Sequence, residues 1–198
     1  MILKEDSSEQ KLRGAYYTPL KLAKKMVDFF KDDLSIKSIL EPSCGDGVFV
    51  DALLESQFLS QHKRVTAIEI EKKEAEKLSE KLKDNSNIDV VNGDFFEFYH
   101  KHKDMDTYDL ILGNPPYIRY QYLEEKQRSE MAEILTSHGM KANKLINTWV
   151  GFMVACVHML SDNGKIAFVI PAEILQVAYA EDLRLFLSNK LSFGISFP

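Results

Sequence analysis

The sequence predicts an α/β fold with a doubly wound, mostly parallel β-sheet. Short runs rich in β-branched residues alternate along the chain with longer segments of helical periodicity, and this alternation is typical of parallel strands joined by helices. The strand runs are apolar almost throughout, which indicates strands covered on both faces. No internal repeat or low-complexity tract interrupts the pattern, so residues 1–198 are expected to form a single domain.

The strands are expected in short runs rich in Val, Ile and Leu. These runs cover residues 37–42, 64–70, 88–94, 108–114 and 164–171. In open sheets of this kind, ligands bind beyond the carboxyl ends of the strands, at the point where the strand order reverses. The residues that follow each strand are therefore the first candidates for function.

Helical segments lie between these strands. Residues 71–85 are highly charged and predict an exposed helix that ends at Asn85, whereas residues 145–164 predict a buried helix that ends at Asn163-Gly164. Residues 19–34 predict an amphipathic helix with one apolar face, formed by Leu20, Ala23, Met26, Val27 and Phe30.

The composition is that of an ordinary globular protein, with 198 residues, 45% hydrophobic and 28% charged. The N-terminal segment MILKEDSSEQ is polar and acidic, unlike a secretory signal. The longest apolar run begins at Trp149 and has 12 residues, whereas a membrane span needs about 18 or more. We therefore expect a cytoplasmic protein with no membrane partner.

The cysteines, histidines and net charge argue against other classes of protein. Cys44 and Cys156 have no CxxC spacing, and the five histidines include no HExxH, so we expect neither a disulfide framework nor a metal site. The net charge is −5, whereas a chain that binds nucleic acid unaided usually shows a basic face.

The first strand is followed by EPSCGDGVFVDALLE, in which Gly45 and Gly47 form a tight turn that lets backbone approach a ligand. This is not the GxGxxG fingerprint, because Val48 and Val50 follow, and it is not a P-loop, because no Gly-Lys-Ser/Thr occurs. A glycine pair by itself also fits an ordinary tight turn.

Acidic residues follow the next two strands. Glu69 lies 22 residues after Gly47, where a carboxylate is placed to accept hydrogen bonds from ribose hydroxyls; it also suits the start of the next helix. Asp94 suits an adenine amino group, with Phe95 or Phe96 against the ring, and equally suits a helix cap with Glu97. Together, the three strand ends predict a nucleoside cofactor site.

The fourth strand ends in NPPY, from Asn114 to Tyr117. The two prolines fix the backbone and remove two N–H donors, which presents the Asn114 side-chain oxygen and the Pro115 carbonyl as paired acceptors. Acceptors of this kind would grip the hydrogens of an exocyclic amine and direct its lone pair toward a methyl donor, while Tyr117 stacks on an extruded base. No general base is needed before the attack.

These motifs resemble those of the S-adenosylmethionine-dependent N6-adenine DNA methyltransferases. NPPY follows the fourth strand, EPSCGDGVF follows the first, and GAYYTPLKLAKKMV, from Gly14, resembles the family's methionine-binding segment. The order of the three fits the gamma arrangement found in type I and type II restriction–modification systems. The resemblance extends from about residue 13 to about residue 175.

The resemblance implies a Rossmann-like class I methyltransferase fold, S-adenosylmethionine as methyl donor with S-adenosylhomocysteine as product, and methylation of the N6 amino group of a flipped adenine in DNA. It further implies a set of cofactor contacts. The methionine end lies against Tyr17, Thr18 and Pro19, and the middle against Glu41 and the loop Pro42, Ser43, Cys44, Gly45 and Gly47.

The remaining roles follow by position in the same way. Glu69 is implied to hold the ribose and Ile70, Asp94 and Phe95 the adenine, while Pro171 borders the pocket. Asn114, Pro115, Pro116 and Tyr117 are implied to form the catalytic motif, with Asn114 also next to the cofactor.

The sequence departs from the family pattern in two ways. The family has a sixth strand, an aromatic that packs on the flipped base and a final antiparallel strand, but here the sixth strand would be residues 193–198. The family also has a target-recognition domain, for which no segment is present. We therefore expect the front portion of a longer protein that binds double-stranded DNA and works with a restriction or specificity subunit.

The segment after NPPY, residues 118–144, is polar and carries several Arg, Lys and Tyr residues. Arg119 and Tyr120 are expected to meet a phosphate or the orphaned strand. A solvated helix and loop is an equal expectation for the rest.

Other functions fit parts of the pattern. Protein-glutamine and RNA-guanine N-methyltransferases also carry NPPY, but a YYTP-like opening is not expected of them. A non-catalytic module with the same fold is a second alternative. A cytosine-C5 methylase is disfavoured, because neither cysteine follows a proline in a nucleophile loop.

Overall fold

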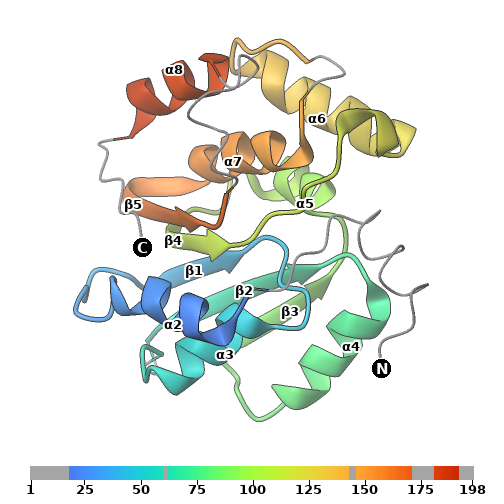
Figure 1. The fold of residues 1–198 in the computed structure, drawn as a ribbon. Coiled ribbons are helices and arrows are strands. Elements are labelled where there is room, and N and C mark those ends of the chain that lie inside the picture. The colour runs from blue at the N-terminus through green and yellow to red at the C-terminus, as the bar shows by residue number, and fades with distance from the viewer. Residues whose placement is uncertain (1–17, 60–61, 143–145, 171–180, 192–198) are drawn as a thin grey trace.

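The computed structural model describes residues 18–59, 62–142, 146–170 and 181–191. Strands and helices alternate from α2 to β4, and η1, α6 and α7 then follow one another before β5 and α8 (Figure 1). The strands are β1 (Ser38–Glu41), β2 (Arg64–Glu69), β3 (Ile88–Asn92), β4 (Tyr108–Gly113) and β5 (Leu160–Phe168). The helices are α2 (Leu20–Asp28), α3 (Val48–Glu55), α4 (Lys72–Lys81), α5 (Phe95–His102), the 3-10 turn η1 (Tyr120–Tyr122), α6 (Glu125–Ser137), α7 (Thr148–His158) and α8 (Glu181–Lys190).

The described strands form one sheet in the order β3-β2-β1-β4-β5, and every neighbouring pair is parallel. The chain moves outward from β1 to β3 on one side and then returns to β4 on the other side of β1, so the strand order reverses between β1 and β4. The predicted doubly wound sheet is therefore confirmed. The sixth strand expected at residues 193–198 lies outside the described residues.

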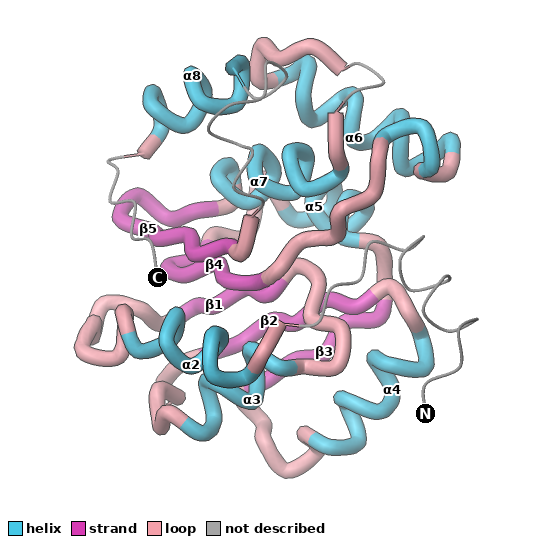
Figure 2. The backbone as a smooth tube through the Cα atoms, viewed as in Figure 1, coloured by secondary structure: helices cyan, strands magenta, loops and turns pink. Residues whose placement is uncertain are grey.

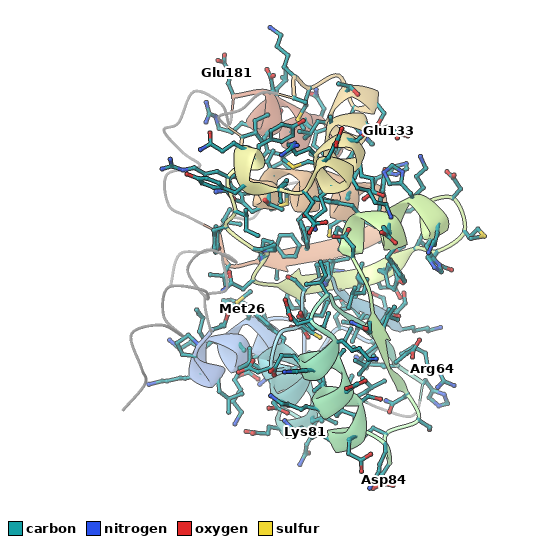
Figure 3. The ribbon with its side chains drawn as sticks, turned by 90° about the vertical axis from the view of Figure 1, so that its right-hand side faces the viewer. Met26, Arg64, Lys81, Asp84, Glu133 and Glu181 are labelled. Carbon is teal, nitrogen blue, oxygen red and sulfur yellow. The ribbon has the colours of Figure 1, made fainter. Side chains whose placement is uncertain are left out.

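Alternation of side chains along the strands builds a core on each face of the sheet. Ile39 and Leu110 pack with α2 and α3, whereas the next residues, Leu40 and Ile111, pack with α5, α6, α7 and α8. Figures 1 and 2 show the sheet between these two helical layers. Glu133 and Glu181 mark one layer, and Met26 and Lys81 mark the other (Figure 3).

Several predicted boundaries are wrong. The expected strand at residues 37–42 shortens to β1, and α2 ends at Asp28, well before residue 34. On the expected apolar face of α2, Ala23 and Val27 are fully buried, but Leu20 is 36% exposed because it begins the helix. Helix α4 ends at Lys81, not at Asn85.

The buried helix predicted to end at Asn163-Gly164 ends earlier, at His158, and the polar residues Ser161–Gly164 lie inside β5. Pairing begins at once after the helix, since Tyr108 donates its backbone N–H to the Met159 carbonyl at 2.8 Å. A bulge follows, where the register shifts between Tyr108 and Leu110. It accommodates the extra polar residues, which the sequence pattern had placed at the end of the preceding helix.

The segment after NPPY contains a packed helix as well as a loop. Helix α6 buries Met131, Ile134 and Leu135 in the core formed with α5 and α7. Within the described ranges, the structure contains no helix with the length and apolar composition that crossing a bilayer would require.

Candidate active site

The glycine loop after β1 adopts a left-handed backbone conformation in which the Gly47 N–H donates to the Cys44 carbonyl at 2.8 Å. Gly45 and Gly47 have φ values of 53° and 84°, in the left-handed region that favours glycine. At Gly47 a Cβ would stand 2.4 Å from Leu78 Cδ1, so glycine is also required for the close approach of α4. Cys44, between them and β1, is buried, and burial raises the pKa of its thiol.

Glu69, at the end of β2, fixes this loop. Its Oε2 accepts from the Gly45 N–H at 2.8 Å and its Oε1 accepts from the Glu71 N–H at 2.8 Å. Burial raises the pKa of the carboxyl, against the lowering effect of these two hydrogen bonds. Each carboxylate oxygen accepts more than one hydrogen bond, so the same group retains capacity for a ligand hydroxyl.

Glu41, the last residue of β1, is 1% exposed, and its Oε2 has no hydrogen-bond partner among the described residues. Burial raises the pKa of this carboxyl well above its ordinary value, and the nearby carboxylates of Asp46 and Glu69 raise it further. A buried acid without a partner is costly. The carboxyl end of the central strand therefore carries an unsatisfied acceptor in a region of negative charge.

Asp94, after β3, links two helices. Its Oδ1 accepts from the backbone N–H groups of Phe96 and Glu97, so it caps α5 as the sequence allowed. Its Oδ2 accepts from Gln127 Nε2 at 2.7 Å, which ties the start of α6 to the start of α5. Phe95 is buried, and its ring centroid lies 4.6 Å from that of Phe152 on α7.

Asn114 follows β4 and joins three segments of the chain. Its Nδ2 donates to Thr18 Oγ1 at 3.1 Å, and its Oδ1 accepts from the Tyr117 hydroxyl at 2.9 Å. The Tyr117 hydroxyl also lies 2.6 Å from the Val169 carbonyl oxygen, just beyond β5. The Asn114 amide thus connects Thr18, before α2, with Tyr117 and, through the tyrosine hydroxyl, with the end of β5.

The structure brings most of the predicted residues to one edge of the sheet. The carboxyl ends of β1, β2, β3 and β4 present the groups named above, and Ser43 Oγ lies 3.4 Å from the Asn114 carbonyl oxygen. Pro42 also borders this edge. A Cβ atom added to Gly113, the last residue of β4, would lie 3.6 Å from the Pro42 Cδ. Pro115 is buried and Pro116 half-buried beside Asn114.

Other predicted residues differ in setting. Ile70 is 55% exposed at this edge. Pro19 is exposed, and its carbonyl accepts from Leu22 and Ala23 as α2 begins. Tyr17 and Pro171 lie outside the described residues. No group of three or more His, Cys, Asp or Glu side chains suited to a metal ion occurs among the described residues.

The sequence reasoning missed Gln127 and Phe152. A signal for Gln127 was present, because Glu124 and Gln127 form a capping box at the start of α6. Phe152 had no local signal, since it lies within a uniformly apolar run and meets Phe95 only through the fold. The Val169 carbonyl that holds Tyr117 is backbone and has no sequence signal at all.

A sequence model described as the Eco57I restriction-modification methylase matches residues 16–195, nearly the whole chain. The chain belongs to this family. The predicted resemblance to restriction–modification methylases is thereby confirmed.

Two relatives are type II methyltransferases. The chain is 30% identical to the type II methyltransferase M.AccI of Acinetobacter calcoaceticus over 172 residues, which are 87% of this chain and 30% of that protein. It is 31% identical to M.HincII of Haemophilus influenzae over 188 residues, 95% of this chain and 34% of that protein. The chain thus spans about a third of the length of these relatives.

The fold is also found in a solved structure, that of a type I restriction-modification system methyltransferase subunit from Streptococcus thermophilus. It superposes with a TM-score of 0.72 at 19% identity, and the match covers 89% of this chain and 39% of that chain. At this identity the likeness supports the fold, which is that of the class I S-adenosylmethionine-dependent methyltransferases.

Proposed function

We propose that this chain is the catalytic portion of a DNA methyltransferase that uses S-adenosylmethionine and methylates the N6 amino group of an extruded adenine. The observation that carries the proposal is the arrangement at Asn114. An amide acceptor, a rigid diproline and an aromatic ring stand at the switch point of the sheet, next to the glycine loop. Family membership supports methyl transfer within a restriction–modification system.

The edge of the sheet suits S-adenosylmethionine. The methionine end of the cofactor carries a sulfonium, an ammonium and a carboxylate, and is therefore positive overall, whereas the nucleoside end is neutral. The unpartnered carboxyl of Glu41, with Asp46 and Glu69 near it, suits the cationic end. The exposed side chain of Ile70 offers an apolar surface to the adenine, and Glu69 lies between them for the ribose hydroxyls.

When bound, S-adenosylmethionine supplies an electrophilic methyl group. The residues of the chain prepare the acceptor for it. Asn114 Oδ1 and the Pro115 carbonyl accept the two hydrogens of the target amine, which localises the nitrogen lone pair that is otherwise delocalised into the ring. Tyr117 stacks on the extruded base. After transfer the nitrogen is cationic and acidic, so its proton passes to water without a dedicated base.

The test uses the full-length protein, duplex DNA and methyl-labelled cofactor. Label is expected in DNA and, after nucleoside digestion, as N6-methyladenine by mass spectrometry. Asn114→Ala should abolish turnover and leave the Kd for S-adenosylhomocysteine nearly unchanged, because its bonds form to the reacting amine. Glu69→Ala should mainly weaken cofactor binding.

Other outcomes would contradict the proposal. Label found only in protein or ribosomal RNA would place the chain with the other NPPY methyltransferases, and no transfer to any DNA would favour a non-catalytic module. Calorimetric titration with S-adenosylhomocysteine, with NAD as control, tests the cofactor site separately. A large loss of cofactor affinity in Asn114→Ala would mean that this residue has been given the wrong role.

A further inference from the structure

The segment just after NPPY pairs with the segment just before α7, thirty residues further along the chain. Tyr120 donates its N–H to the Ile146 carbonyl at 3.0 Å, and Thr148 donates to the Ile118 carbonyl at 2.8 Å. Between these bonds Arg119 and Asn147 form an antiparallel bridge. The loop from β4 to α6 is therefore joined to the start of the buried helix α7 (Figure 2).

The bonding pattern fixes how Arg119 and Asn147 lie. The two hydrogen bonds join their neighbours, not the residues themselves, so they are a non-hydrogen-bonded pair. Side chains of such pairs leave the same face of the ribbon with their Cβ atoms about 4.5–5.5 Å apart. A guanidinium and an amide thus stand next to each other, two residues beyond Tyr117.

Both side chains have unused hydrogen-bonding capacity. Asn147 Oδ1 is buried and no described residue donates to it, and although Asn147 precedes α7 its side chain does not cap the helix. Arg119 is exposed, and no hydrogen bond or ion pair of its guanidinium occurs within the described residues. An unsatisfied buried oxygen requires an explanation.

An aromatic ring completes the surface. Tyr122 is 64% exposed and lies one 3-10 turn beyond Arg119, since the Tyr122 N–H donates to the Arg119 carbonyl at 2.8 Å. Tyr120, which the sequence suggested for this role, is half-buried, and its hydroxyl lies 3.3 Å from the Arg128 carbonyl. The neighbouring Leu123 is buried and anchors the turn.

The turn is also fixed to the proposed cofactor site. Arg128 Nη1 donates to the Leu123 carbonyl at 2.6 Å, and Gln127 connects the start of α6 to Asp94. Thr148 Oγ1 adds a second bond to the Ile118 carbonyl at 2.6 Å. Arg119 and Tyr122 are therefore displayed on a braced support, which lowers the entropy lost when they bind a partner, and Asn147 lies beside Arg119 with its Oδ1 buried.

We propose that Arg119, Tyr122 and Asn147, the turn surface, grip DNA next to the extruded nucleotide. This rests on the proposed function. Arg119 only donates, so it suits the phosphate oxygens, and Tyr122 suits stacking on an unpaired base. Asn147 Oδ1 only accepts. Within a DNA strand, phosphates and sugars offer no donor, so a base N–H group is the partner that suits this oxygen, and because the oxygen is buried the contact requires that the side chains covering it move aside. Asn147 is thus the residue of the three that reads sequence.

The experiment measures DNA affinity, its salt dependence and methylation kinetics of the full-length protein and its variants. Arg119→Ala should weaken binding equally for all sequences and lower the slope of log K against log salt by about one. Tyr122→Ala should weaken binding by about fivefold to a hundredfold, and Tyr122→Phe should not, because it keeps the ring. Asn147→Ala should lower kcat/KM for the preferred site about tenfold and reduce its preference over sites with changed neighbouring bases.

Two matched controls remove the same chemical groups elsewhere. Arg64→Ala replaces an exposed arginine at the amino end of β2, at the opposite edge of the sheet. Asn163→Ala replaces an exposed asparagine near the start of β5. Neither should change the DNA affinity. The Kd for S-adenosylhomocysteine should stay within about twofold of wild type in every variant, which separates this surface from the cofactor site.

The proposal fails if Arg119→Ala and Asn147→Ala leave DNA binding and kinetics unchanged. It also fails if the two substitutions do not change DNA binding, and the double variant lowers the melting temperature by an amount that differs from the sum of the two single variants. The two side chains would then simply bind each other. Tighter binding of RNA than of DNA through Asn147 would overturn the choice of partner, since a 2′-hydroxyl also donates. If the wild-type protein methylates no DNA, the proposed function fails first.

Discussion

Tyr117 combines a ring that is proposed to stack on a base with a hydroxyl that holds the ring in place. The hydroxyl reaches both Asn114 Oδ1 and the Val169 carbonyl oxygen, so the ring is fixed relative to the amide and to the end of β5. The two functions of the side chain can be separated by substitution. Phenylalanine removes the anchor and keeps the ring, whereas alanine removes both.

Tyr117→Phe should lower kcat by no more than about tenfold, because it costs one neutral hydrogen bond of about 1 kcal/mol. Tyr117→Ala should lower kcat by up to a further hundredfold, since stacking on a base contributes about 1–3 kcal/mol. Single-turnover methylation of DNA by the full-length protein measures both. Equal losses in the two variants would show that the hydroxyl, not the ring, is the part that matters.

Glu41, which we propose faces the cofactor, is buried at the expense of stability. Its raised pKa means that the folded protein holds this proton at a pH where the unfolded chain has released it. For an acid of this kind, the free energy of unfolding falls as pH rises above the ordinary carboxyl pKa. An ammonium group bound beside Glu41 would favour the ionised form, and S-adenosylhomocysteine keeps the ammonium although it has lost the sulfonium charge, so its binding should release a proton.

Glu41→Gln should therefore raise the melting temperature of the ligand-free protein at pH 8 by about 2–4 °C, with a smaller gain at pH 5. The same variant should bind S-adenosylhomocysteine more weakly and without proton release, as measured by calorimetry in buffers of different ionisation enthalpy. Asp89→Asn, exposed on the edge strand β3, is the control for stability. Unchanged affinity in Glu41→Gln would remove Glu41 from the cofactor site.

At the scale of elements, one carboxylate connects the amino ends of three strands. Asp109 Oδ2 accepts from the N–H groups of Lys37 and Ser38, and its Oδ1 accepts from Ser161 Oγ at 2.8 Å. Burial raises the pKa of Asp109, but these hydrogen bonds lower it by more, so it lies below its ordinary value. Strands β1, β4 and β5 are thus tied opposite the site.

Asp109→Asn should lower the free energy of unfolding at pH 7 by about 1.5–3 kcal/mol, the range for hydrogen bonds to charged groups. Because the folded pKa is depressed, this contribution is complete above the unfolded pKa of about 3.8 and is lost as pH falls through the folded value. Urea unfolding should show a smaller difference in the free energy of unfolding between wild type and variant at pH 3 than at pH 7. Asp89→Asn, exposed on the edge strand β3, should stay within about 0.5 kcal/mol throughout.

The elements that the sequence predicted well are those whose pattern is local. Strands β2, β3 and β4 begin where expected, at Arg64, Ile88 and Tyr108, because β-branched runs report a pleated, buried setting directly. The start of β5 was misplaced because its polar residues pair only through a bulge. Burial of α6 was missed because it depends on contact with α5 and α7, which no local pattern reveals.

The same distinction applies to the candidate site. Glycines, carboxylates and NPPY at successive strand ends could be read from the sequence, because parallel strands bring their carboxyl ends to one edge. Contacts between distant segments could not. The bond from Asn114 to Thr18 spans 96 positions, and the bridge from Arg119 to Asn147 arises only when the loop and α7 pack together.

At the scale of the whole molecule, the negative charge of the chain acts in opposite ways on the two proposed ligands, the cofactor and DNA. The net charge is −5, and Glu41, Asp46 and Glu69 surround the glycine loop. This field attracts a cationic cofactor and repels phosphates. The turn surface contributes one exposed arginine. Strong DNA affinity is therefore not expected of residues 1–198, which span about a third of the length of the relatives named above.

The 198-residue chain should therefore bind S-adenosylhomocysteine but hold duplex DNA only weakly, with a Kd of about 1–100 µM near physiological salt, the range of non-specific binding. The full-length protein should bind its preferred site at about 10 nM or tighter. Fluorescence anisotropy with labelled duplexes at several salt concentrations compares the two. Because each phosphate contact adds about one to the slope of log K against log salt, the short chain should show a slope near one. Nanomolar binding by the short chain would mean that residues 1–198 already contain the main DNA-binding surface.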